Sequence, residues 1–265
     1  MTISKGSVPI ETLEDWERFA GPKSAHQWVD GRSAKEAART WLEGAPLKLP
    51  LEVSSVLESC PDFGPVLEWH AEPEVRLPFD NFPGEPRNSD LVLWARDGHG
   101  PFVVAVEAKA DEPFGRTVGE TLSDGLEKRI ENPRSKLLDR VEQLARSLLP
   151  AQARGGPSAA ELRYQLLTAC AGALAEAERQ SCERAIMLVH EFITDKTDNV
   201  LHQANSADLN KFLGRISDGK ACAGETDQLF GPLSVPGEPL FSANTRLYLG
   251  KVQRNIRTEH VVADL

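Results

Sequence analysis

The stretch 88–115 decides the fold of this chain. It reads Asn-Ser-Asp-Leu-Val-Leu-Trp-Ala-Arg at 88–96, Asp-Gly-His-Gly at 97–100, and Phe-Val-Val-Ala-Val-Glu-Ala-Lys-Ala-Asp-Glu-Pro-Phe-Gly at 102–115. Two apolar segments on either side of a glycine-rich turn predict a β-hairpin. Side chains two apart on a strand point to the same face, so Glu107 and Lys109 project together. The hairpin is expected to bring Asp90 alongside them.

These side chains predict a divalent metal site. Mg²⁺ prefers oxygen ligands and is usually held by one or two carboxylates with water and substrate phosphate. Asp90 and Glu107 supply two carboxylates, the backbone carbonyl of Ala108 supplies a third oxygen, and Lys109 places a positive charge beside a metal-bound water. A strand that ends in Glu-x-Lys is often only a solvated edge. The run 102–106 is continuously apolar, however, and charges at the end of a strand buried on both faces need a partner or a metal.

The arrangement resembles the PD-(D/E)XK nuclease superfamily, which has the restriction-endonuclease-like fold. Ser89-Asp90 takes the place of its Pro-Asp, and Glu107-Ala108-Lys109 the place of its (D/E)XK. The phrases 106–109, 112–115 and 163–167 also resemble an uncharacterised bacterial branch of that superfamily. The resemblance covers roughly Pro50 to Ile193. It implies an α/β fold with an αβββαβ core, a mixed central sheet flanked by helices, and Mg²⁺ as cofactor with Mn²⁺ as the alternative.

The predicted elements follow the order of that core. Ser33 to Gly44 reads as a helix with Ser33 as its cap and Glu36 as the capping-box partner. Further helices are expected at 51–59, 135–149 and 159–178, and strands at 66–79 and 185–193. In the superfamily a helix packed across the sheet adds a Gln, Arg or Lys to the site. The resemblance therefore implies Gln165 in the site and Arg163 and Tyr164 on phosphate; alternatively, all three merely solvate the helix end.

One more acid usually completes the metal site of the superfamily from its first helix. Glu36 and Glu58 are the candidates, and Glu36 is preferred because Glu58 lies at a helix end whose dipole disfavours an acid. Asp111 and Glu112 follow Lys109 directly and are read either as ligands of a second metal or as a solvated strand end.

Length and composition set wider limits. The 265 residues are expected to form a single domain, 1–265, with a core at about 33–195 and an extension at about 200–265 that adds an edge strand at 245–252. The four cysteines form no Cys-x-x-Cys pair, which argues against a zinc site. Neither a membrane-length apolar run nor a signal peptide is present, so a cytoplasmic protein is expected.

The functional hypothesis is a metal-dependent nuclease that hydrolyses phosphodiester bonds, with DNA as the expected substrate. The net charge of −10 argues against non-specific coating of nucleic acid. That charge favours the alternative, a catalytically silent nuclease-fold protein that acts as a binding or structural subunit. A homodimer or a protein partner is compatible with both hypotheses.

Overall fold

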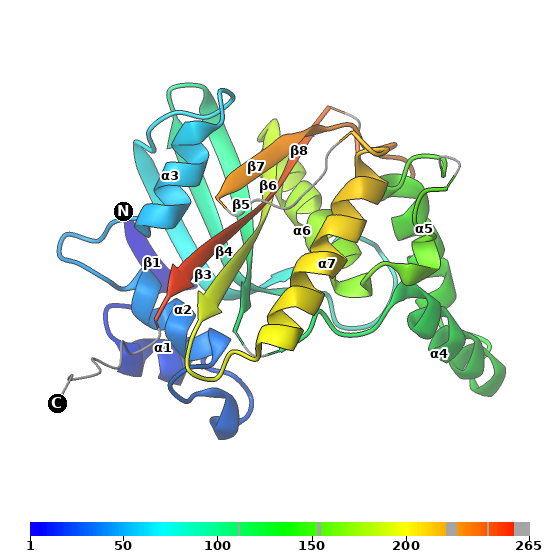
Figure 1. Cartoon of the computed structure of the whole chain (residues 1–265), viewed down its shortest axis with the longest axis horizontal. Coiled ribbons are helices and arrows are strands. Elements are labelled where there is room, and N and C mark those ends of the chain that lie inside the picture. The colour runs from blue at the N-terminus through cyan, green and yellow to red at the C-terminus, as the bar shows by residue number, and fades with distance from the viewer. Residues whose placement is uncertain (111, 153–154, 221–226, 243, 257–265) are drawn as a thin grey trace, which may run out of the picture.

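A mixed β-sheet forms the centre of the computed structural model of this chain (Figure 1). The structure describes residues 1–110, 112–152, 155–220, 227–242 and 244–256. Within them, the sheet has eight strands in the order β2-β1-β3-β4-β5-β6-β8-β7. Their bounds are Thr2–Lys5 for β1, Val8–Pro9 for β2, Glu68–Leu77 for β3, Arg87–Asp97 for β4, Gly100–Lys109 for β5, Arg184–Ile193 for β6, Gln228–Leu233 for β7 and Arg246–Asn255 for β8.

Helices cover both faces of this sheet. On one face lie α1 (Leu13–Ala20), α2 (Ser33–Trp41) and α3 (Leu51–Ser59). On the other face, α6 (Tyr164–Arg179) packs against the strands, with α5 (Leu137–Leu148) and α7 (Asn199–Ile216) beside it. Figure 1 shows α4 (Val118–Glu131) farther from the sheet, where it packs against α5. The result is a layered α/β fold.

The order of the central elements is αβββαβ, as predicted. Helix α3 leads into β3, β4 and β5, which pair antiparallel, and α6 then crosses to β6, which lies parallel to β5. Helices α4 and α5 are inserted between β5 and α6. A crossover between parallel strands needs a connection of this length, usually a helix, because the chain must return to the same end of the sheet.

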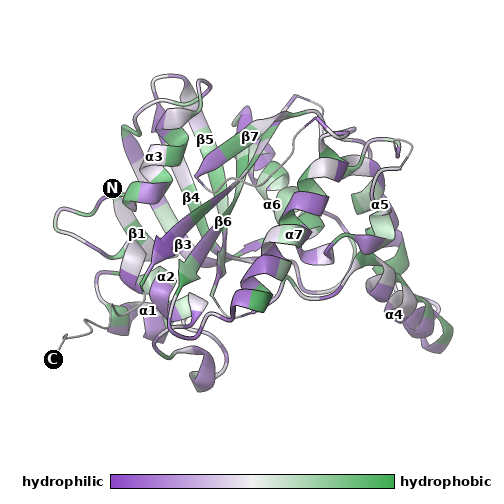
Figure 2. Ribbon diagram, in the orientation of Figure 1, coloured by the Kyte–Doolittle hydropathy of each residue, from purple (hydrophilic) through white to green (hydrophobic). Residues whose placement is uncertain are grey.

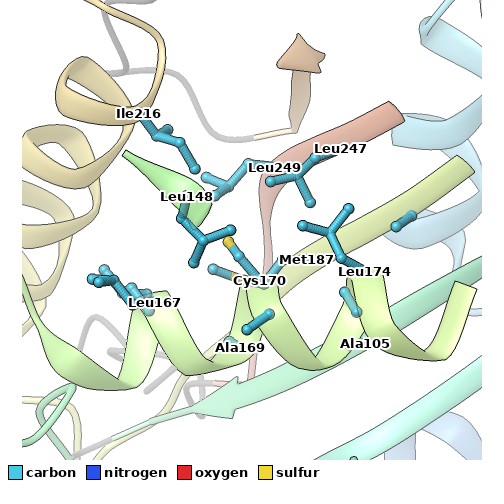
Figure 3. Packing of buried hydrophobic residues seen from close by; sticks show 14 of the residues in the cluster. Ala105, Leu148, Leu167, Ala169, Cys170, Leu174, Met187, Ile216, Leu247 and Leu249 are labelled. Atoms are coloured by element: carbon cyan, nitrogen blue, oxygen red, sulfur yellow. The ribbon is translucent and has the colours of Figure 1, made fainter. Parts of the chain in front are cut away.

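The core explains why β5, β6 and α6 are almost wholly apolar. Strand β6 lies between the parallel strands β5 and β8, and its two faces pack against the two helical layers. All of its residues except the last are buried. Figure 2 shows the apolar colour concentrated on the central strands. Figure 3 shows Cys170 and Leu174 of α6 beside Met187, with Leu167 farther along the same helix. All three α6 side chains are buried.

The structure also corrects several local predictions. Helix α2 begins at Ser33, but its cap is Arg32, and no side chain caps it. Strand β8 is not an edge, because β7 pairs with it on the outer side. Helices α1 and α4 were not predicted, although Thr117 and Glu120 form a capping box at the start of α4.

Candidate functional site

A cavity of about 370 Å³ opens where β3, β4 and β5 meet the loop before α2. We call it the acidic cavity. Its lining contains acids, cations and amides from five different parts of the chain, namely Pro22, Lys23, Gln27, Arg32, Ser33, Ala34, Glu74, Asn88, Asp90, Glu107, Ala108, Lys109, Glu112 and Gln165. It therefore holds Asp90, Glu107, Lys109 and Gln165, which the sequence had placed in one site.

Three acids lie side by side across three neighbouring strands. The antiparallel register that pairs Leu91 with Val106, extended by one residue, sets Asp90 of β4 opposite Glu107 of β5. The register between β3 and β4 sets Glu74 opposite Asp90 in the same way. Residues directly opposite one another in an antiparallel pair face the same side of the sheet. The hairpin thus brings Asp90 and Glu107 together, and β3 adds a third acid.

Glu107 is the most heavily engaged of these acids. It is buried, and its Oε1 accepts a hydrogen bond of 2.8 Å from Lys109 Nζ and another from Gln165 Nε2. Arg87 at the start of β4 pairs with Oε2. Burial opposes ionisation of Glu107, but the charges of Lys109 and Arg87 outweigh it and hold the pKa of this carboxyl below its usual range. Glu107 is therefore an anion held by two cations.

Asp90 lies in the opposite electrostatic situation. Its Oδ2 accepts one hydrogen bond, 2.7 Å long, from the backbone N–H of Ala108. Burial is the main cause that raises its pKa well above the usual value, and the neighbouring charges of Glu107 and Glu74 raise it further, against the effect of Lys109. A cation placed between Asp90 and Glu107 would stabilise the ionised form of Asp90 and so offset both causes. This is the observation by which the residues fit a divalent metal.

Glu74 adopts a backbone conformation that is unusual inside a strand. Its φ is +54°, in the left-handed region, which costs free energy for a residue with a side chain. Lys5 of β1 stabilises this bend, because its Nζ donates to the carbonyl oxygens of Pro73 and Glu74 at 2.9 and 2.8 Å. Burial raises the pKa of Glu74, although Asn88 donates a hydrogen bond to its carboxylate. The bend directs Glu74 to the acidic cavity.

Helix α6 supplies Gln165, but its neighbours point elsewhere. Arg163 binds Asp208 of α7 at 2.7 Å and the carbonyl of Gly115 at 2.6 Å, and it does not line the acidic cavity. Tyr164 lines a different cavity. The first turn of α6 therefore divides its polar side chains among three environments, which a helical projection of the sequence alone does not reveal.

The preferred upstream acid, Glu36, is not at the acidic cavity. It is buried, and its Oε1 accepts from the backbone N–H of Gly31 at 2.7 Å and from Arg39 at 3.0 Å. Glu58 is exposed on α3 and does not line the cavity either. Glu74 of β3 lines the cavity in which Glu36 was expected. The reason is local: Glu36 satisfies the backbone of the loop that precedes its own helix.

Two further observations bear on metal binding. Glu112 lines the acidic cavity, whereas Asp111 lies outside the described residues. Across the part of the chain that the structure describes, no group of three or more His, Cys, Asp or Glu side chains could hold a metal ion as it stands. A metal here would need two carboxylates from Asp90, Glu107 and Glu74 together with the Ala108 carbonyl and water.

Sequence reasoning missed Glu74 and Arg87. Neither belongs to a motif, and only the strand register and the side-chain contacts reveal them.

Within the described residues, no helix is long and apolar enough to cross a membrane. No curated protein and no solved structure matches the chain. A family model described as a domain of unknown function (DUF6946) matches residues 9–256, and the chain therefore belongs to that family.

Proposed function

We propose that this protein is a metal-dependent nuclease of the PD-(D/E)XK type that hydrolyses phosphodiester bonds, with DNA as its substrate. One observation carries the proposal. Asp90, Glu107, Lys109 and Gln165, from two strands and the crossing helix, line one open cavity, and half-buried Asp90 accepts a single hydrogen bond from the described residues beside two other acids. Such perturbed acids in a cavity are typical of functional sites.

The residues divide the chemical work. Asp90, Glu107 and the Ala108 carbonyl would hold Mg²⁺ or Mn²⁺, with Glu74 as the additional acid in place of Glu36. The metal ion supplies a nucleophilic water at neutral pH and neutralises phosphate charge. Lys109 stands 2.8 Å from Glu107 and is expected to orient the attacking water or stabilise the charge that develops on phosphate. Gln165, bonded to Glu107, positions that carboxylate.

One observation favours the alternative, a catalytically silent protein with this fold. Arg87 and Lys109 already neutralise Glu107, and the side chain of Arg87 is only 8% exposed. These two ion pairs neutralise the charge of Glu107 without a bound metal ion. In the nuclease, metal binding must loosen the contact between Arg87 and Glu107. In the silent protein, that contact is permanent.

A cleavage assay separates the two. Purified protein is incubated with plasmid or oligonucleotide DNA and Mg²⁺ or Mn²⁺, and Lys109→Ala is expected to lower the rate by ~10²-fold, as when a preorganised electrostatic group is removed. Lys48→Ala is the matched control, because Lys48 is exposed and lies outside the cavity. Absence of cleavage of DNA and RNA, together with no metal-dependent rise in Tm, would replace the nuclease with the silent protein.

A further inference from the structure

A second cavity of about 260 Å³, which we call the side cavity, lies beside the acidic cavity. The loop between β3 and β4 forms one wall, and the beginnings of α5 and α6 form the other. Its lining comprises Pro78, Phe79, Asp80, Phe82, Gly84, Glu85, Pro86, Arg87, Leu137, Arg140, Tyr164 and Thr168. Three of these residues carry half-buried aromatic rings, namely Phe79, Phe82 and Tyr164.

The two cavities share a wall built from consecutive residues. Arg87 lines the side cavity, whereas Asn88 lines the acidic cavity. At the start of α6, Tyr164 and Gln165 divide between the cavities in the same way. The guanidinium of Arg87 crosses this wall, since it pairs with Glu107 and donates to Thr168 Oγ1 at 3.5 Å. Its buried Nε has no hydrogen-bond partner among the described residues.

The side cavity is held open by its own contacts. Arg140 of α5 binds Asp80 through two hydrogen bonds of 2.6 and 3.1 Å. The same guanidinium donates to the carbonyl oxygens of Phe82 and Pro83, both at 3.4 Å. These bonds fix the loop that carries the aromatic rings against α5. A preformed cavity binds with a smaller ordering cost than one that must assemble on the ligand.

The lining favours a flat, uncharged, aromatic ligand. Each arginine already has an acid, Asp80 for Arg140 and Glu107 for Arg87, so little net charge remains to attract a separate phosphate. The volume lies below the ~300 Å³ at which sites for drug-sized ligands begin. Aromatic side chains bind nucleobases by stacking, and arginine and threonine supply hydrogen bonds to base edges.

We propose that the side cavity binds one unpaired nucleobase of the substrate strand, stacked on Phe82, next to the phosphate in the acidic cavity. The proposal rests on the proposed nuclease function and names its substrate class. A base inside a cavity cannot remain paired and stacked in a duplex. Single-stranded nucleic acid is therefore the preferred substrate, and Arg87 links the base site to the acid that would hold the metal.

The test uses a single-stranded oligonucleotide, its duplex, and a series in which one abasic nucleotide is moved along the strand. Wild-type protein is expected to cleave the single strand faster than the duplex. One abasic position beside the cleaved bond should lower kcat/KM at least about fivefold, the low end for loss of stacking on an aromatic ring. Phe82→Leu keeps bulk without the ring, and it should lower kcat/KM on the intact strand and abolish the abasic effect.

The control is Phe19→Leu, which removes a partly exposed ring on α1 that lines neither cavity. This variant should keep the wild-type abasic profile. The proposal is overturned if no abasic position matters, or if Phe82→Leu retains the full abasic effect.

A binding experiment distinguishes this proposal from the proposed function. Fluorescence anisotropy in EDTA compares intact and fully abasic labelled oligonucleotides, with no cleavage required. Wild-type protein should bind the intact strand at least about fivefold tighter than Phe82→Leu does. If cleavage is absent but this difference is present, the nuclease function fails and the base site stands. Equal binding of intact and abasic strands removes the base site, even if the protein cleaves DNA.

Discussion

Strand β4 carries one aspartate near each end, and the two lie in opposite environments. Asp97 accepts two hydrogen bonds from Arg184, at 2.7 and 2.9 Å, and one each from the backbone N–H groups of Gly64 and His99. Burial opposes its ionisation, but these donors outweigh burial and lower its pKa to about 2. Asp90 has one backbone donor and two acidic neighbours, and its pKa is raised.

The difference teaches how to recognise a functional acid on a strand. Asp97 is buried and Asp90 is half-buried, and burial opposes the ionisation of both carboxyl groups, so burial does not explain why their pKa values shift in opposite directions. The two carboxylates differ in their hydrogen-bond donors. Four hydrogen bonds stabilise the negative charge of Asp97, whereas Asp90 accepts one from the described residues, and a bound cation could stabilise its charge. The end of β4 that carries Asp97 thus stabilises the protein, and the end that carries Asp90 is expected to bind the metal ion.

The largest expected effect is the loss of stability when the ion pair between Arg184 and Asp97 is broken. Arg184→Ala should lower the free energy of unfolding by about 3–5 kcal/mol, because it leaves Asp97 buried without its partner. Urea denaturation measures the change. Arg246→Ala is the control, since its contacts to Asp62 and Glu183 are longer than 3.7 Å and partly exposed, and it should change stability by less than ~1 kcal/mol. Equal losses in both variants would contradict the comparison.

The loss of stability at acid pH should also depend on Asp97. A carboxyl whose pKa is depressed by folding stabilises the protein above its unfolded pKa, and this contribution is lost as the pH falls through the folded pKa. For Asp97 that window runs from its ordinary value of 3.8 down to about 2. Urea midpoints of the wild type should fall across it, and Asp97→Asn should show a shallower fall. Parallel curves would assign acid sensitivity to other groups, such as Glu52, whose pKa is also lowered to about 2.

At the other end of β4, the third acid should contribute to metal affinity. Glu74→Gln removes a charge from the acidic cavity but keeps the hydrogen-bonding shape of the side chain, and it is expected to weaken Mn²⁺ binding about tenfold, as for supporting groups around metal sites. Isothermal titration calorimetry measures this. Glu36→Gln lies outside the cavity and should leave the affinity unchanged. The reverse ranking would restore Glu36 as the additional ligand.

The smallest change in stability is expected at Asp90 itself. Asp90→Asn removes the repulsion with Glu107 and Glu74, so the free energy of unfolding should stay the same or rise by up to about 1 kcal/mol. The same variant should lose the metal-dependent rise in Tm. A strong loss of stability would mean that Asp90 holds the hairpin together through Ala108, as Asp97 holds the other end.

Much of this arrangement could be predicted because it is local. The hairpin follows from a glycine-rich turn between two apolar segments, and Asp90 opposite Glu107 follows from a two-residue period on paired strands. The almost wholly apolar body of 166–177 indicates a helix buried against the sheet, with Gln165 in its first turn. These inferences need only spacing and hydrophobicity, whereas the place of Gln165 in the site is what the resemblance to the nuclease superfamily implies.

What could not be predicted depends on contacts between distant segments. Glu74 joins the cavity through the register of β3 on β4 and through a left-handed bend that Lys5 stabilises from β1. Arg87 reaches Glu107 across twenty residues. Glu36 was a candidate because of its place on the predicted first helix. Its carboxylate instead accepts a hydrogen bond from the backbone N–H of Gly31, which lies in a loop whose path the sequence does not reveal.

The paired positions 87/88 and 164/165 have a practical consequence for protein engineering. Tyr164 lines the side cavity and Gln165 the acidic cavity, so the side cavity can be varied at 164 without a change among the acids, whereas Arg87 contacts Glu107 and has to be kept. A library that randomises 79, 82 and 164 while it fixes 88, 90, 107, 109 and 165 would explore ligand preference on a constant set of acids. Selection from such a library would yield variants that differ in what they recognise and share one chemistry.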